Sequence, residues 1–251
     1  MSAELYFQKI TKVLDRIHST QGDKISRAGE VMASAIAAGK RVYLFGSGHS
    51  VLPVLDVFPR YGSFVGFFPL YDPRLMWFNV VGPGGARELL WLERKEGYAK
   101  VFLQSYPLVA GDCMLVFSHG GLNAAPIEIA QEARNSGLKV ISVSSLSNYQ
   151  VSKANHSSGL KLPDVSDIAI DNGVEPEDSQ VDVGWPEKVA AGSTVASVFV
   201  AMSLVAEVGA RLAQRGLHPQ TFVSPNVPGV EKDHNQQVFL SFTKALYSPR
   251  S

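Results

Sequence analysis

The sequence contains a single cysteine, Cys113, which lies inside an apolar stretch. One thiol can form neither an intrachain disulfide framework nor a cysteine-based metal site, so both are excluded. Net charge is also absent, because 23 basic residues balance 23 acidic ones. Such a chain has no long-range attraction for nucleic acid or for an anionic membrane. It can still bind a small anion through local backbone N–H groups.

Targeting signals are missing as well. The amino terminus has no basic segment followed by an apolar run, so no secretory signal is predicted. No stretch approaches the roughly 18 uninterrupted apolar residues of a membrane span. We therefore expect a cytoplasmic protein that binds neither membrane nor nucleic acid.

The composition is that of a folded domain, with 45% apolar and 18% charged residues in a chain of 251. No internal repeat or low-complexity tract divides it. We predict one domain over residues 1–251, with N-terminal helices in residues 1–40, a core in residues 41–215 and a C-terminal tail in residues 216–251.

Apolar periodicity alternates between helix and strand along the core. Helices are predicted at residues 4–19, 25–38, 51–60, 87–106, around Pro126 to about 135, 195–214 and 236–247. Strands are predicted at residues 41–45, 63–68, 113–118, 139–143 and 165–170, with a long loop at 69–85 and an irregular acidic segment at 173–186. Alternating strands and helices favour a parallel sheet with helices on both faces. The expected fold is an α/β three-layer sandwich with a five-stranded parallel sheet.

The first strand runs into the turn Gly46-Ser47-Gly48-His49-Ser50. Glycines let the backbone turn tightly and approach a ligand, and the following helix start favours an anion. We interpret the turn as a phosphate site that uses the hydroxyls of Ser47 and Ser50. A dinucleotide fingerprint is an alternative, but its third glycine would fall at Val51. A tight turn without a ligand is the other alternative.

A second turn of the same kind, Ser118-His119-Gly120-Gly121-Leu122-Asn123, follows the third strand. Its His-Gly-Gly sequence also occurs in the oxyanion loop of lipases and esterases. That interpretation requires a Gly-x-Ser-x-Gly nucleophile downstream, and none is present. In a parallel sheet the ligand binds beyond the carboxyl ends of the strands, where both turns are predicted to lie.

These turns, in this order, resemble the SIS (sugar isomerase) domain superfamily of phosphosugar-binding proteins over residues 25–214. In that family one strand ends in Gly-Ser-Gly-x-Ser and a later one in Ser-x-Ser-Gly-x-Thr. Here Gly120 replaces the central serine and Asn123 the threonine, so one phosphate-binding hydroxyl is lost. Residues 137–144 and 165–171 resemble the family's next two strands.

Within the superfamily the chain is similar to an uncharacterised bacterial subgroup. The similarity is carried by residues 92–97, 171–173, 193–194 and 224–226. This subgroup resembles phosphoheptose isomerase and N-acetylmuramic acid 6-phosphate etherase. The resemblance implies a sugar-phosphate isomerase or an etherase-type lyase, assembled as a homodimer or homotetramer with shared sites. It also leaves open a non-catalytic phosphosugar sensor that regulates a partner.

Both reactions need a base that moves a proton next to a carbonyl. In the related enzymes a glutamate on the helix before the second turn does this, which implies Glu93 or Glu96, with Glu88 a weaker candidate. Carboxylates on a helix are otherwise usually a solvated face, and Arg94 could pair with one of them. His49 and His119 could polarise a sugar oxygen, and His234 could reach a neighbouring subunit's site.

The predicted site combines both turns with two further polar pairs. Ser193 and Thr194 begin a helix, where they suit an N-cap or a sugar phosphate equally. No His-x-His or His-x-x-x-His spacing supports a metal, and no cofactor is expected. The predicted catalytic residues are Glu93, Glu96, His49 and His119. The predicted substrate-binding residues are Gly46, Ser47, Gly48, Ser50, Ser118, Gly120, Gly121, Asn123, Ser144, Ser145, Ser193 and Thr194.

Overall fold

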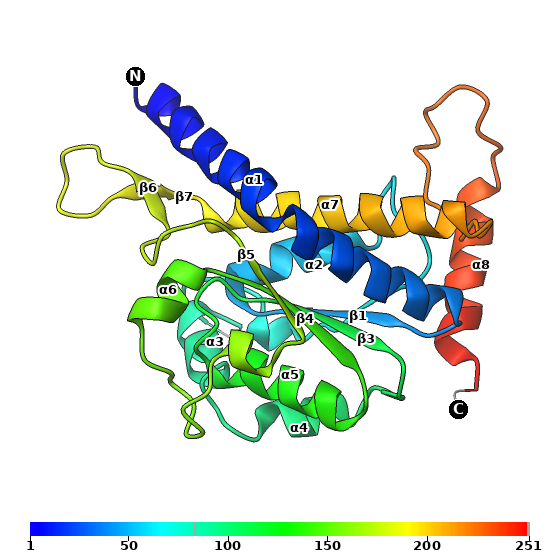
Figure 1. The fold of residues 1–251 in the computed structure, drawn as a ribbon, viewed down its shortest axis with the longest axis horizontal. Helices are drawn as coiled ribbons and strands as arrows, with labels where there is room; N and C mark the ends of the chain where they lie inside the picture. Colours follow the sequence, from blue (N-terminus) through cyan, green and yellow to red (C-terminus); the bar gives the residue numbers. More distant parts are fainter. Residues whose placement is uncertain (83, 250–251) are drawn as a thin grey trace.

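The computed structural model describes residues 1–82 and 84–249. Its centre is a five-stranded sheet in the order β2-β1-β3-β4-β5, with every neighbouring pair parallel (Figure 1). The strands are β1 (Val42–Gly46), β2 (Phe67–Pro69), β3 (Cys113–Phe117), β4 (Lys139–Ser144) and β5 (Ile168–Asp171). The central strands are buried along almost their whole length because helices cover both faces. The predicted three-layer fold with a five-stranded parallel sheet is confirmed.

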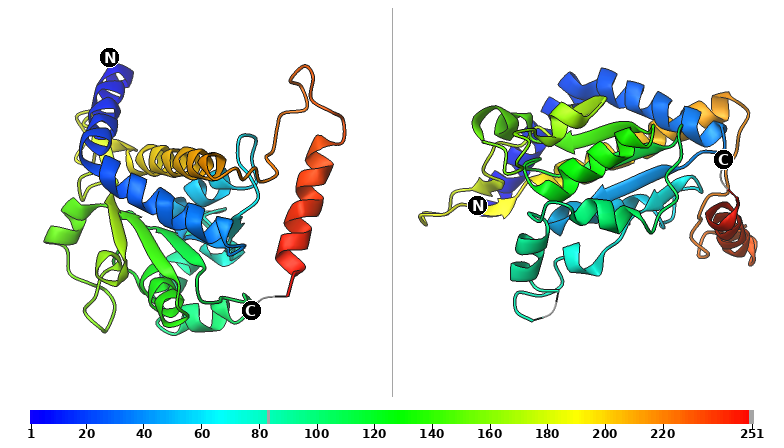
Figure 2. Two further views of the ribbon diagram at one scale, coloured as in Figure 1. Left: turned by 45° about the vertical axis from the view of Figure 1, so that its right-hand side comes forward. Right: turned by 90° about the horizontal axis from the view of Figure 1, so that it is seen from below.

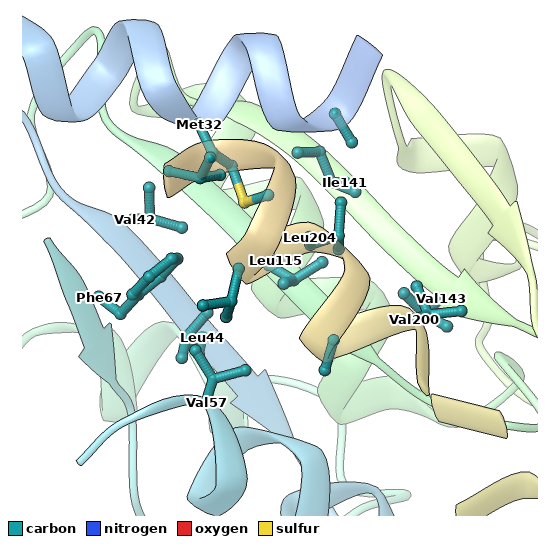
Figure 3. Packing of buried hydrophobic residues seen from close by; sticks show 14 of the residues in the cluster. Met32, Val42, Leu44, Val57, Phe67, Leu115, Ile141, Val143, Val200 and Leu204 are labelled. Atoms are coloured by element: carbon teal, nitrogen blue, oxygen red, sulfur yellow. The ribbon is translucent and has the colours of Figure 1, made fainter. Parts of the chain in front are cut away.

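Three helices cover one face of the sheet: α1 (Ser2–Ala37), α2 (Val51–Val57) and α7 (Ser193–Gln214). Figure 3 shows Met32 of α1 and Leu204 of α7 packed over Val42 and Leu115 of the sheet. The other face is covered by α3 (Ala86–Leu92), α4 (Tyr98–Leu103) and α5 (Ala124–Asn135).

Several short elements complete the chain. They are η1 (Gly48–Ser50), η2 (Pro73–Leu75), α6 (Leu146–Val151), η3 (Leu162–Val165), the hairpin strands β6 (Ser179–Val181) and β7 (Val189–Ala191), and α8 (His234–Tyr247). The β6–β7 hairpin projects from one end of the molecule, and α8 lies at the opposite end (Figures 1 and 2).

The two helices predicted before residue 40 are one continuous helix, α1, which bends near its middle (Figure 2). No residue between the two predicted segments blocks the helix, since neither proline nor a left-handed glycine occurs there. The Gln21 side chain, buried in this region, accepts a hydrogen bond from the Asp171 N–H at 3.0 Å. The residues between the two predicted helices therefore belong to α1, and Gln21 among them contacts the end of β5.

The single helix predicted at residues 87–106 is instead two helices, α3 and α4. Gly97 adopts φ = 86°, a left-handed conformation that ends helical continuity. The Glu128 carboxylate accepts hydrogen bonds from the N–H groups of Gly97 and Ala99 and thereby begins α4. The break places Glu93 directly after α3 rather than in a helix interior.

Three other predictions were wrong in extent. The segment predicted as irregular between residues 173 and 186 contains β6, which pairs with β7. The strands predicted at 63–68 and 165–170 begin later, at Phe67 and Ile168. In addition, the structure has the short helix α6 at Leu146–Val151, where no element was predicted.

By length and composition alone α7 could cross a membrane, although the sequence has no uninterrupted apolar run of that length. In the structure α7 packs along α1 and α2 and contributes Val200, Leu204 and Val208 to the core. Helices in the cores of folded domains have the same composition, so the feature is weak support for a membrane span.

Candidate functional site

The candidate site lies where β1 and β3 end side by side. The chain leaves β1 for β2 on one side and later enters β3 on the other, so this point is the switch in strand order. Gly46 and Phe117, the last residues of the two strands, are register partners. The two predicted turns therefore start next to each other, in the crevice where open parallel sheets bind ligands.

The first turn needs its glycines for steric reasons. A Cβ at Gly46 would lie 2.1 Å from the Ser50 carbonyl oxygen, which real structures do not allow. Gly48 has φ = 59°, in the left-handed region. The turn continues through η1 into α2, with the Ser50 N–H bonded to the Ser47 carbonyl at 3.1 Å.

The second turn is held by its neighbours. The carbonyls of four successive residues, 119 to 122, accept hydrogen bonds from Ser145 N, Asn148 Nδ2, Leu162 N and Asn155 N. In a trans peptide the N–H points opposite to the carbonyl. The N–H groups of the same peptide units therefore face away from α6 and residues 155–162. The Ser118 hydroxyl accepts from the Gly121 N–H at 3.2 Å and so closes the turn.

Glu93 connects the two turns. One carboxylate oxygen accepts from the Ser47 hydroxyl at 3.1 Å and the other from the Asn123 amide at 2.9 Å. Its own carbonyl accepts from the Ala125 N–H at 2.9 Å, which ties the α3–α4 break to the start of α5. Of the two glutamates predicted as the base, Glu93 is the one that the structure brings to both turns.

Glu93 is only 8% exposed. Burial raises its pKa above the usual range, while the Ser47 hydroxyl and the Arg94 charge, 3.5 Å away, act in the opposite direction. Arg94 is half exposed, so its charge is screened by water. A carboxylate with a raised pKa is closer to the protonation equilibrium that a general base needs near neutral pH.

The side chain of Glu96, the other predicted base, does not contact either turn. Its two oxygens accept from the N–H and the hydroxyl of Ser157, each at 2.6 Å. These bonds lower its pKa, and its side chain is 41% exposed. Glu88 lies elsewhere again, accepting from the Gly84 N–H at 2.7 Å. Both carboxylates hold loops in place.

The two predicted histidines differ in their surroundings. His49 is exposed, and its ring lies on Trp77 with centroids 4.8 Å apart. His119 Nδ1 is 3.1 Å from the Asn172 amide nitrogen, whose carbonyl oxygen accepts from the Val174 N–H. The Asn172 amide therefore donates to Nδ1, and the neutral imidazole carries its proton on Nε2. That buried Nε2 has no hydrogen-bond partner among the described residues.

The remaining predicted residues differ in whether their hydroxyl groups already have a hydrogen-bond partner. Ser145 is buried, caps α6 by accepting from the Asn148 N–H, and donates to the Val174 carbonyl. The buried Ser144 hydroxyl has no partner within the described part of the chain. Ser193 is the first residue of α7 rather than its N-cap, and its hydroxyl donates to Asp178 at 2.8 Å.

Asp178 already fills the anion position that was predicted for substrate at α7. Its carboxylate accepts from the Gly192 and Ser193 N–H groups as well as from the Ser193 hydroxyl. A phosphate at this helix end would have to displace it. Thr194, in the same first turn of α7, is partly exposed.

The residues that support the site were not found from the sequence. The Asn155 side-chain amide donates to the side-chain oxygen of Asn123 (Oδ1) at 3.0 Å, and the Asn172 amide nitrogen lies 3.1 Å from His119 Nδ1. His156 lies between Glu128 and Glu96, at 3.5 and 4.0 Å. Each contact joins residues at least 28 positions apart, so no local pattern marks it. His234 bonds to the Thr221 carbonyl in the tail, and no cluster of three metal-ligating side chains occurs in residues 1–82 and 84–249.

The sequence model of the SIS domain family matches residues 5–145 of the chain. The chain is 33% identical over 243 residues to the UPF0309 protein of Oceanobacillus iheyensis, covering 96% of this chain and 97% of that one. It is 34% identical over 220 residues to the UPF0309 protein of Streptomyces coelicolor, covering 86% of each.

Solved structures resemble the fold. The phosphoheptose isomerase of Neisseria gonorrhoeae superimposes with a TM-score of 0.55 at 13% identity, covering 83% of this chain and 97% of that one. For the phosphoheptose isomerase of Francisella tularensis the TM-score is 0.51 at 16% identity, covering 81% and 94%. At such low sequence identities the likeness concerns the fold alone.

Proposed function

Because the chain belongs to the SIS domain family, we propose that it binds a phosphorylated sugar and acts on it as a cytoplasmic sugar-phosphate isomerase or lyase. The phosphate occupies the crevice between the turns at residues 46–50 and 118–123. Glu93 is the base. The observation that carries this proposal is the position of Glu93, a buried carboxylate with a raised pKa that bridges both turns.

The turns supply neutral donors for an anion. The Ser50 hydroxyl stands in the first turn, whereas the Ser47 hydroxyl already donates to Glu93. In the second turn the Gly121 N–H donates to Ser118, and the other N–H groups face away from the loops that hold the carbonyls of the turn. Oriented N–H groups bind phosphate without a basic surface, which suits a chain with zero formal charge.

Glu93 and His119 divide the chemistry of an isomerisation. Glu93 takes the proton from the carbon next to the carbonyl, and the electron pair moves to the carbonyl oxygen. The His119 Nε2–H is buried and has no protein partner among the described residues. It donates to that oxygen once substrate displaces the groups that cover it, and so stabilises the charge. Glu93 then returns the proton to the former carbonyl carbon. The proton of the neighbouring hydroxyl passes to the former carbonyl oxygen, so that the neighbouring carbon becomes the new carbonyl. In a lyase the same abstraction is followed by loss of a β-substituent instead.

The first experiment is a thermal-shift screen of sugar phosphates beside their unphosphorylated parents. A ligand that binds only the folded state at about 100 times its Kd adds roughly 2.7 kcal/mol of stability. We expect a phosphorylated sugar to raise the melting temperature and its parent to leave it unchanged. If no sugar phosphate in the panel raises the melting temperature at millimolar concentration, the phosphosugar proposal is wrong.

Glu93→Gln and Glu96→Gln then form a matched pair, because both glutamates lie in the same α3–α4 break. Loss of the base should lower kcat by about 10²- to 10⁴-fold in Glu93→Gln. Glu96→Gln should stay within about threefold, since its side chain holds the loop at Ser157. Equal losses in both variants would mean that Glu93 is not the base.

A phosphosugar sensor without catalysis is the second candidate. Both Glu93 oxygens already accept hydrogen bonds, so the carboxylate could serve only to join the turns. Gly120 also lacks the hydroxyl of the family pattern. Ligand binding without turnover in the native protein would favour this function, whose partner would be a protein rather than nucleic acid.

The proposed assembly is a homodimer or homotetramer with shared sites. Trp77, Phe78 and Trp91, on the loop and helix beside the first turn, are 42%, 64% and 59% exposed. Aromatic side chains are enriched at protein interfaces relative to the rest of the surface. Light scattering should give a dimer or tetramer for the native protein and a smaller species for Trp91→Arg. A native monomer with full activity would contradict shared sites, including any role for His234 across subunits.

A further inference from the structure

A large pocket lies between α8 and the β2 edge of the sheet, and none of its lining residues belongs to either turn of the candidate site. Its volume is about 610 Å³, within the range of small-molecule sites. α8 stands beside the body of the molecule here (Figures 1 and 2). The edge strand β2 has only three residues, and α8 covers it from the side.

Aromatic contacts hold α8 over the pocket. Phe242 lies between Phe58 and Phe68, with ring centroids 5.1 Å away in each case. Phe239 contacts Phe222 at 5.3 Å. These rings form walls of the pocket without filling it. Apolar walls of this extent suit an apolar occupant.

Arg41 is the one charged side chain among the described residues that line this pocket. It is 4% exposed, and its guanidinium lies over the Phe68 ring at 4.6 Å. Three hydrogen bonds run from it to neutral groups, namely the Tyr43 hydroxyl and the carbonyls of Ala245 and Leu246 at the end of α8. A guanidinium has five N–H donors, so these bonds do not exhaust it.

No ion pair among the described residues joins Arg41 to a carboxylate. Buried charges in proteins are nearly always paired, because an isolated charge is costly to remove from water. The carbonyls at the end of α8 compensate the charge only as partial dipoles. The pocket thus combines apolar walls with a positive charge that lacks a full counter-charge.

We propose that this pocket binds an amphipathic carboxylate, a molecule with one carboxylate group on an apolar body. The carboxylate pairs with Arg41, and the body lies among Phe58, Phe68 and Phe242. Burial raises the pKa of Tyr71, which also lines the pocket, to about 12, so its hydroxyl stays neutral beside such a ligand. Occupation would fasten α8 to the sheet edge, because the ligand contacts both.

Aliphatic and aromatic carboxylates share this chemistry, and the test distinguishes them. Decanoate and 2-naphthoate are titrated into the native protein by calorimetry, each beside the neutral alcohol of the same body. We expect at least one carboxylate to bind about tenfold more tightly than its alcohol, as for one charge-assisted contact. Binding of decanoate alone identifies an aliphatic ligand, and of 2-naphthoate alone an aromatic one. Equal binding of acid and alcohol, or no binding, overturns the proposal.

Two variants locate the binding. Ser105, exposed at the rim, lines the pocket, whereas its neighbour Gln104 is exposed and does not. Ser105→Trp should weaken carboxylate binding about tenfold by occupying the pocket, and Gln104→Trp should leave it unchanged. Both positions are outside the core, so both proteins should fold. Equal affinity in the two variants would place the probe elsewhere and overturn the proposal.

Arg41→Gln tests the charge itself. The amide keeps a hydrogen-bond donor near the end of α8 but removes the positive charge. In this variant the preference for acid over alcohol should fall below about twofold. A preference that persists excludes Arg41 as the counter-charge. Should Arg41→Gln fail to fold, the comparison of Ser105→Trp with Gln104→Trp still decides the question.

Discussion

The two turns that meet at Glu93 are stabilised by opposite means. The turn at residues 46–50 is determined by its own backbone, since Gly46 has no room for a side chain. The turn at residues 118–123 is held from outside, through four carbonyls that accept bonds from α6 and residues 155–162. One turn depends on which residues it contains and the other on what surrounds it.

Gly120 makes the difference concrete. A Cβ there would lie 3.6 Å from the Asn148 amide, an ordinary van der Waals distance, and Gly120 is not among the left-handed glycines. The backbone therefore does not require glycine where the family pattern has serine. A departure from the pattern at Gly46 would be structural, whereas the one at Gly120 changes only the groups offered to a ligand.

Of the substitutions that test this contrast, Gly46→Ala should have the largest effect on stability. The new methyl group must displace the Ser50 carbonyl, so we expect the free energy of unfolding to fall by about 3 kcal/mol. Gly120→Ala, the matched control, should change it by no more than about 0.5 kcal/mol. Urea unfolding of both variants gives the comparison. Similar losses would show that the second turn is as constrained as the first.

The two hydrogen bonds to Glu93 provide a finer test. Ser47→Ala removes one donor to the buried carboxylate and should cost about 1.5 kcal/mol. Asn123→Ala should cost more, about 2 kcal/mol, because Asn123 also accepts from Asn155. In a Glu93→Gln background both losses should shrink. Losses that stay the same there would mean that neither bond to Glu93 contributes to stability.

The pH dependence of stability separates Glu93 from Glu96 by sign. Burial raises the pKa of Glu93, so between its ordinary and raised pKa the folded state binds more protons than the unfolded chain. The free energy of unfolding then falls as pH rises through that window. The bonds from Ser157 lower the pKa of Glu96, so its contribution is lost as pH falls.

Chemical unfolding from pH 3 to pH 8 measures both contributions. Relative to the native protein, Glu93→Gln should gain stability as pH rises above the ordinary carboxyl range. Glu96→Gln should lose relative stability over its own window as pH rises. Slopes of the same sign for the two variants would contradict the environments that the structure gives these carboxylates.

The sheet could be predicted from the sequence because its signals are local. Each central strand is a short apolar run, and the alternation with helices indicates that the strands are parallel. The break between α3 and α4 was missed because apolar spacing continues through it. Only the left-handed Gly97 and the distant Glu128 interrupt the helix.

The two turns of the candidate site could be predicted from the sequence, but the separate roles of the residues around them could not. Glu93 and Glu96 are equivalent in the sequence, three residues apart on one predicted helix. The α3–α4 break and the bonds from Asn123 and Ser157 distinguish them. Ser157 lies 61 residues from Glu96, and Asn123 lies 30 from Glu93. Contacts at such separations depend on the whole fold and leave no periodic signal.

Gly120→Ser should have the smallest effect on stability, yet it tests what the second turn lacks. The backbone can accept the side chain, so the variant should fold like the native protein. If phosphate binds in this crevice, the added hydroxyl should tighten a sugar phosphate by up to about tenfold, the value of one good hydrogen bond. Gly120→Ala, which adds the Cβ without the hydroxyl, is the control in the same titration. If both variants weaken binding alike, the ligand approaches the turn too closely for any side chain at Gly120, and the glycine serves the substrate rather than the fold.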